Sequence, residues 1–75
     1  MERNMFLAKF AEQFEDTDPN EIKFETVFRD LDEWSSLVGL MVLGMVKEDF
    51  GKDLTALELK SCITVEDVYQ MINKK

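Results

Sequence analysis

At residues 33–51 the chain reads EWSSLVGLMVLGMVKEDFG, and this segment determines the architecture that the remaining residues can adopt. Two serines precede a long uncharged run, which predicts a helix from Ser36 to about Phe50. Ser35 is a suitable N-cap because its hydroxyl can accept a hydrogen bond from a first-turn amide, and Gly51 suits the left-handed residue after a helix end. A group attached to the Ser36 hydroxyl would then lie at a helix N-terminus, whose free amides and macrodipole favour a phosphate.

The buried face of this helix must be inferred from its polar end, because residues 37–46 are all apolar or glycine. Lys47 and Glu48 should face solvent, and residues three and four positions earlier share their side of the helix. That spacing places on the exposed side Leu37, Leu40, Met41 and Gly44, and on the buried side Gly39, Val42, Leu43, Val46 and Phe50. An exposed side this apolar indicates either an interaction surface or a bundle that encloses the helix all round. Gly39 and Gly44 each cost about 1 kcal/mol relative to alanine in a helix interior, so they are expected to allow close helix contact or space for a guest group.

Two more principal helices are expected around this one. The first runs from Glu2 to about Glu15, where the apolar residues have helical spacing, and Pro19 with its polar neighbours ends it. The last opens at Thr64, which resembles the start of a capping box completed by Asp67. Its expected buried face comprises Val65, Val68, Tyr69 and Ile72.

The remaining residues connect these helices. A long packed loop is expected before Trp34, because the apolar side chains in it have much surface to bury. Residues 25–29 could form a helical turn within it, and residues 56–60 one or two turns before the last helix. No strand pattern or internal repeat occurs. The expected fold is therefore all-α, a small four-helix bundle of three principal helices and one short helix with a long packed first loop, in a single domain over residues 1–75.

The net charge of −7 arises in one segment of the chain. Residues 12–33 hold nine acids and only two bases, whereas acids and bases balance in the other residues. Negative charge repels phosphate backbones, which argues against nucleic acid as a partner, and it attracts basic protein surfaces. The alternative is that the acids only keep a small protein in solution.

Catalysis by the chain itself is not expected. Because the chain has no histidine, Ser-His-Asp and Cys-His devices are excluded. The single cysteine, Cys62, is expected to be a buried structural thiol, and it provides neither a disulfide nor a zinc site. Asp16, Asp18 and Asn20 match the first ligands of an EF-hand loop, but the later glycine and glutamate of such a loop are missing. We therefore expect these residues to form a turn and expect no metal site.

The location of the protein is inferred from its apolar runs. The longest uncharged run, residues 34–46, is too short to cross a bilayer, and the first residues do not resemble a secretory signal. A lone cysteine fits a reducing compartment. We expect a cytoplasmic monomer without stable membrane insertion.

Over nearly its whole length the sequence resembles the acyl carrier proteins. The resemblance is carried by WSSL at residues 34–37, by the apolar helix that ends at Phe50 and Gly51, and by residues 54–59 and 63–68. In that family an Asp-Ser-Leu motif opens the second helix of a four-helix bundle, and its serine carries 4′-phosphopantetheine. The register makes Ser36 the matching serine and Leu37 the matching leucine. Ser35 stands where the family usually has aspartate, which keeps an N-cap but removes a charge.

The resemblance implies a carrier and not an enzyme. A phosphopantetheinyl transferase would move phosphopantetheine from coenzyme A to Ser36, and the thiol of this arm would hold acyl groups as thioesters. Acyl-loading, condensing or acyl-transferring enzymes of fatty-acid, polyketide or related specialised biosynthesis would receive them.

The surface that such partners would recognise departs from the family pattern. The family usually has acids on the exposed side of the second helix, where this chain has Val38 and Met41. Docking is therefore expected at acids on both sides of an apolar centre, through Asp30, Asp32, Glu33, Leu37, Leu40, Met41, Glu48 and Asp49. The alternative function is a small acidic helical interaction module with no prosthetic group. A small hydrolase using Ser36 is a third reading, which the absence of histidine disfavours.

Overall fold

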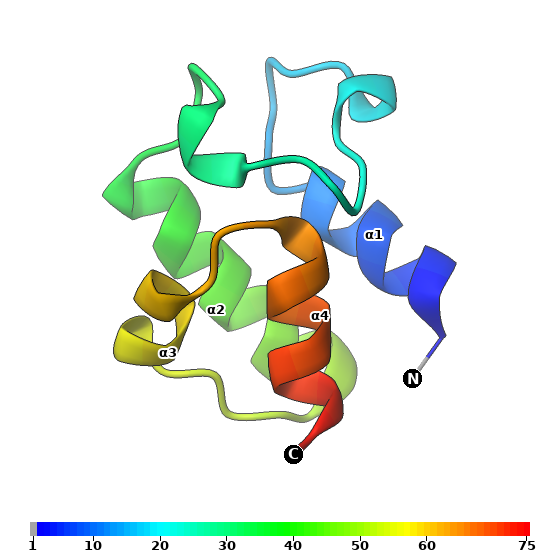
Figure 1. Ribbon diagram of the computed structural model, residues 1–75, viewed down its shortest axis with the longest axis vertical. Helices are drawn as coiled ribbons and strands as arrows, with labels where there is room; N and C mark the ends of the chain where they lie inside the picture. The colour runs from blue at the N-terminus through cyan, green and yellow to red at the C-terminus, as the bar shows by residue number, and fades with distance from the viewer. Residues whose placement is uncertain (1) are drawn as a thin grey trace.

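The computed structural model describes residues 2–75, and these residues form an all-helical fold (Figure 1). Four α-helices and two short 3₁₀ turns follow one another as α1 (Arg3–Ala11), η1 (Pro19–Glu21), η2 (Phe28–Asp30), α2 (Ser36–Phe50), α3 (Ala56–Ser61) and α4 (Val65–Asn73). Within this described part there is no strand, and no helix is long and apolar enough to cross a membrane. The predicted bundle of three principal helices and one short helix is confirmed.

Helix α2 has the predicted bounds and the predicted ends. The Ser35 hydroxyl accepts a hydrogen bond from the Val38 amide at 3.3 Å. At the other end Gly51 has a φ of 66°, and its amide donates to the Lys47 carbonyl at 3.0 Å. Local chemistry at the two ends therefore sets the length of the central helix.

Helix α1 ends at Ala11, four residues before the predicted end at Glu15. After Ala11 the amides of Gln13 and Phe14 bond to carbonyls three residues earlier, which tightens the chain into turns. Phe14 nevertheless remains buried. Apolar residues with helical spacing thus extend beyond the end of α1 to Phe14, because the turn after the helix packs on the same core.

The loop between α1 and α2 is packed, as predicted, and it covers one end of the bundle (Figure 1). Its side chains Ile22 and Phe28 are buried. The expected helical turn is present as η2, slightly later in the chain than residues 25–29. The EF-hand-like residues form a turn, because the Asp18 carboxylate accepts a hydrogen bond from the Asn20 amide at 2.9 Å.

Backbone hydrogen bonds attach this loop to the start of α4. The Val65 amide donates to the Thr26 carbonyl at 3.1 Å, and the Glu66 amide donates to the Phe24 carbonyl at 2.9 Å. An isolated bridge between Val27 and Thr64 accompanies these bonds. The loop thus has the ordered backbone of a structural element without being a helix.

Reciprocal caps open both C-terminal helices. The predicted pair of Thr64 and Asp67 is present, and the amides of Thr64 and Ile63 hold the pKa of the Asp67 carboxyl below its ordinary value. Thr55 and Glu58 form the same arrangement at the start of α3. Helix α3 has only six residues, so these end contacts matter more to it than to the longer helices.

A chain of aromatic rings runs through the core to the residues before Ser36. Its members Phe6, Phe10 and Phe28 are fully buried. The ring centroids of Phe10 and Phe28 are 5.8 Å apart, and those of Phe28 and Trp34 are 4.7 Å apart. The core therefore positions Trp34 directly before α2.

The buried face of α2 differs from the prediction at two positions. Val38 and Met45 are buried, at 6% and 5% exposure, although Val38 was expected to stand among the exposed residues. Both align with the fully buried Val42 and Val46, so the buried stripe is centred on these valines. Leu37 and Leu40 are exposed as predicted, at 67% and 64%. The bundle therefore does not enclose α2 all round.

The two glycines inside α2 do not need to be glycines for packing. A Cβ on Gly39 would lie 3.5 Å from the Trp34 ring and 3.8 Å from Leu59, which is ordinary contact. A Cβ on Gly44 would meet nothing within 4 Å. The predicted packing role of Gly44 is therefore wrong.

Replacing the helical glycine Gly44 should stabilise the fold. Gly44→Ala is expected to raise the free energy of unfolding by about 1 kcal/mol, because alanine loses less backbone entropy in a helix. Gly51→Ala should lower it by about 1–2 kcal/mol, since Gly51 has positive φ. Urea unfolding followed by circular dichroism measures both. Equal effects of the two substitutions would contradict this account.

Candidate functional site

Ser36 is the first residue of α2, and it is exposed. Its hydroxyl makes no hydrogen bond to any other residue of the described chain, whereas the neighbouring Ser35 hydroxyl accepts a bond from the Val38 amide. The two serines therefore differ: Ser35 caps one of the unpaired amides in the first turn of α2, whereas the hydroxyl of Ser36 is exposed to solvent.

A hollow of about 360 Å³ lies beside Ser36, between α2 and α3. Its lining comes from the segment before α2 and from the two helices, and it comprises Arg29, Trp34, Ser35, Ser36, Gly39, Leu40, Leu43, Ala56, Leu59 and Lys60. Sequence analysis identified Ser36 and Leu40 but not the contribution of α3 or of Arg29. The hollow depends on tertiary packing, for which the sequence offered no local signal.

Trp34 forms part of the lining and is anchored in the core. Besides its contact with Phe28, its ring lies 6.2 Å from that of Phe14. The indole also approaches Gly39 in the first turn of α2. Aromatic packing therefore fixes where the chain turns into the helix that begins at Ser36.

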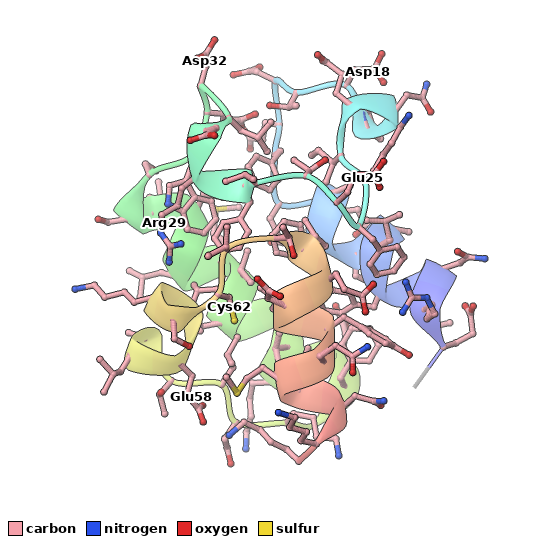
Figure 2. The ribbon with its side chains drawn as sticks, viewed as in Figure 1. Asp18, Glu25, Arg29, Asp32, Glu58 and Cys62 are labelled. Carbon is pink, nitrogen blue, oxygen red and sulfur yellow. The ribbon has the colours of Figure 1, made fainter. Side chains whose placement is uncertain are left out.

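Arg29 supports the wall of the hollow that α3 provides. Its guanidinium donates to the carbonyl oxygens of Cys62 and Leu59, the latter at 2.8 Å, and so adds hydrogen bonds at the C-terminal end of α3, where the Leu59 carbonyl also accepts from the Cys62 amide. Its guanidinium carbon lies 4.9 Å from the Phe28 ring centroid. Figure 2 shows Arg29 between the segment that precedes α2 and the short helix α3.

The predicted docking acids before Ser36 do not all have free carboxylates. Asp30 and Asp32 are exposed. The Glu33 carboxylate accepts hydrogen bonds from the Thr17 hydroxyl at 2.7 Å and the Asp16 amide at 3.0 Å. The bond from Thr17 is the main reason why the pKa of Glu33 lies below its ordinary value. Glu33 therefore links the end of the loop to its beginning at residues 16 and 17, and its negative charge is less available to a partner.

The other predicted docking residues lie along α2. Leu37 and Leu40 are exposed near Ser36, whereas Met41 is half-buried. Glu48 and Asp49 are exposed at the far end of the helix, where Asp49 lies 4.0 Å from the Lys9 ammonium. The structure thus brings the apolar pair close to Ser36 but leaves the C-terminal acids more than three helical turns away, at about 18 Å along the axis.

The acids of the first loop surround a second hollow, of about 490 Å³. Figure 2 shows Asp32 and Asp18 at the same end of the molecule. No group of three or more cysteines, aspartates and glutamates within residues 2–75 is arranged to hold a metal ion. This hollow has the opposite charge from the one beside Ser36.

Cys62 does not belong to the chemistry of the site. It is 2% exposed, and burial raises the pKa of its thiol above the ordinary value. A thiol in that state is mostly protonated near neutral pH and reacts slowly. The prediction of a buried structural cysteine is confirmed.

The two serines should respond differently to substitution. Ser35→Ala is expected to lower the free energy of unfolding by about 1 kcal/mol because the first turn of α2 loses its cap. Ser36→Ala should change it by less than about 0.5 kcal/mol, since this hydroxyl bonds to nothing in the described chain. Urea unfolding measures both, and Ser35→Asp is the control that should retain the cap. A larger loss for Ser36→Ala than for Ser35→Ala would contradict these assignments.

Comparison with known proteins does not assign the chain to a family, because no protein-family model and no curated protein matches it.

Proposed function

We propose that this protein is an acyl carrier that holds acyl groups as thioesters on 4′-phosphopantetheine attached to Ser36. The observation that carries the proposal is the exposed, unengaged hydroxyl at the first position of a 15-residue helix. The resemblance of the sequence to the acyl carrier proteins supports it. Partner enzymes of fatty-acid, polyketide or related specialised biosynthesis would load and unload the arm.

The residues around Ser36 fit a phosphodiester at that oxygen. The positive end of the α2 macrodipole favours a negative group there. No acid lines the adjoining hollow, and Arg29 and Lys60 contribute positive charge to it. The bound arm would supply a thiol for thioester formation.

Attachment requires an enzyme other than this chain. A transferase would break the pyrophosphate bond of coenzyme A and join the phosphorus to the Ser36 oxygen, while the adenosine bisphosphate leaves. The proton of the hydroxyl must pass to a base of the transferase, because no side chain within residues 2–75 bonds to Ser36. We therefore propose a carrier without catalysis of its own.

Partner enzymes would meet an apolar surface beside the attachment point. Leu37 and Leu40 flank the start of α2 with most of their surface exposed. Asp30 and Asp32 provide negative charge on the preceding loop, where they can attract basic surfaces. Exposed leucines equally support the second candidate, an interaction module without a prosthetic group. The two functions differ in what happens at Ser36.

Modification of Ser36 tests the carrier function directly. After incubation with coenzyme A and a broad-specificity phosphopantetheinyl transferase, intact mass should show the addition of one phosphopantetheine. The addition should be lost in Ser36→Ala and kept in Ser35→Ala. No addition to the folded wild-type protein, or an addition that follows Ser35, would overturn the proposal and favour the interaction module.

The loop acids should affect how fast the transferase acts. The double change Asp30→Asn and Asp32→Asn is expected to slow modification severalfold at low salt, because electrostatic attraction accelerates encounter. The difference should shrink as ionic strength rises toward 0.5 M, a value chosen to shorten the screening length to about 4 Å. Rates are measured by time-resolved intact mass.

A matched control separates steering from total charge. Glu25 is exposed and points from another side of the molecule than Arg29 (Figure 2). Glu25→Gln should leave the rate nearly unchanged, whereas Asp32→Asn alone, which removes the same single charge, should slow modification. Equal slowing by the control, or no slowing by the double variant, would show that the acids serve solubility.

A further inference from the structure

Exposed leucines accompany the hollow between α2 and α3 on both helices. Leu40 of α2 lines it with most of its surface exposed, and Leu37 is exposed one turn earlier. On α3 the lining residue Ala56 is followed by Leu57, which is 78% exposed. A small molecule inside the hollow would leave the outward surfaces of these leucines in water. A partner chain laid over the hollow would cover them, so the leucines favour a macromolecular occupant.

Gly39 leaves room in the wall of this hollow that the packing of the helices does not require. A Cβ at this position would make only ordinary contacts with Trp34 and Leu59, which both line the hollow as well. Alanine would therefore fit the fold, and it would favour the helix more than glycine does. The missing side chain keeps a space between the Trp34 ring and Leu59, where an apolar side chain of a partner can enter.

The charged side chains of the hollow are cations, although the protein has a net charge of −7. Arg29 and Lys60 line it, and no acid does. Arg29 is bonded to two carbonyls at the C-terminal end of α3. Lys60, in the last turn of α3, is exposed and forms no ion pair or side-chain hydrogen bond with any residue between 2 and 75. An acidic side chain of a partner would therefore be attracted to Lys60.

The length of the hollow matches one face of a short helix. Its lining on α2 extends from Ser36 to Leu43, which is about 10 Å along the helix axis. Apolar side chains at positions i, i+4 and i+7 of a partner helix cover about the same length. A helix that lies in such a groove buries its apolar face and keeps its flanks polar, which is a recurrent mode of peptide recognition.

We propose that the hollow between α2 and α3 is a docking groove for an amphipathic helix of a partner protein, with large aliphatic side chains on one face and acidic residues on its flank. This role goes beyond the proposed carrier function, because it requires no group on Ser36. A second copy of the chain fits less well, since a symmetric contact between two identical faces would bring the cations of both copies together. The acids of the first loop attract basic partners, so the groove selects a second class of partner by the opposite charge.

Two synthetic peptides of opposite charge test the chemistry of this partner. Each has about 18 residues, above the length at which isolated helices are marginal, and carries leucines at the i, i+3, i+4 and i+7 spacing. One peptide has glutamate at every flanking position, and the other has lysine. In the isotopically labelled, unmodified protein, the glutamate peptide should shift the amide resonances of Gly39, Leu40 and Leu57. The lysine peptide, although the net charge of the protein favours it, should shift those of Asp30 and Asp32 instead.

Paired substitutions separate docking in the hollow from effects on the fold. Gly39→Ala and Gly44→Ala both replace a glycine inside α2, but only Gly39 lines this hollow. Gly39→Ala should weaken binding of the glutamate peptide at least about fivefold, as expected for an extra methyl group in a filled site, and Gly44→Ala should leave it unchanged. Lys60→Gln should weaken it about two- to fivefold, the range for one exposed ion pair. Lys74→Gln removes the same charge at an exposed position of the C-terminal end and should have no such effect.

Several outcomes would overturn the docking role. A glutamate peptide that shifts no amide of the hollow, or a lysine peptide that occupies the hollow as tightly, would contradict it. Equal losses in Gly39→Ala and Gly44→Ala would do the same, since the effect would then come from the helix and not from the hollow. Shifts of the same amides on dilution of the protein or on addition of phosphatidylcholine vesicles, with none from the glutamate peptide, would assign the leucines to a second copy or to a membrane surface. None of these results depends on whether Ser36 accepts phosphopantetheine, so failure of the groove and failure of the carrier function are distinguishable.

Discussion

The contact between Phe28 and Trp34 is the constraint on which the site depends. Their ring centroids lie 4.7 Å apart, and Phe28 is in turn packed on Phe10 of α1. This contact fixes the last residues before α2 to the deepest part of the core. Ser35 can then cap the helix, and Ser36 emerges at its first position with its hydroxyl in solvent. An exposed hydroxyl is thus held in place by a half-buried tryptophan that packs on fully buried phenylalanines.

Charge is distributed in two separate regions on either side of this anchor. The first loop collects acids around one hollow, while Arg29 and Lys60 line the other. Arg29 belongs to the acidic loop by sequence, but its guanidinium reaches across to the end of α3. One long side chain therefore transfers positive charge from the loop to the neighbourhood of Ser36. A partner with a basic surface and a ligand with a phosphate would be attracted to different places.

Sequence reasoning succeeded where structure depends on a few adjacent residues. Ser35 and Gly51 predicted both ends of α2, and Thr64 with Asp67 predicted the start of α4, because caps act within one helical turn. The same pattern at Thr55 and Glu58 was present in the sequence and would have marked the start of α3. These signals need no knowledge of the tertiary structure.

Prediction from the sequence was weaker for features that depend on packing between segments far apart in the chain. The spacing from Lys47 and Glu48 left Val38 and Met45 out of the buried stripe of α2, because residues 37–46 contain no polar side chain that would fix the orientation of the helix locally. The end of α1 was placed too late since Phe14 packs on the core from a turn. The place of Ser36 at the start of α2 was predicted from the cap before it, whereas the packing that brings Arg29 and Lys60 into the lining of one hollow with Ser36 was not. The hollow therefore could not be predicted from local patterns.

The shortness of α3 has a mechanical consequence for the hollow. Six residues are too few to sustain a helix alone, so α3 is held by Thr55 and Glu58 at one end and by Arg29 at the other. The Lys75 ammonium adds a contact to Glu58 at 2.8 Å. Loss of these few polar bonds would widen the hollow, while the aromatic core would keep α1, α2 and α4 in their positions relative to one another. The size of a group that fits in the hollow beside Ser36 therefore depends on the polar contacts that hold α3 in place, and not on how densely the core is packed.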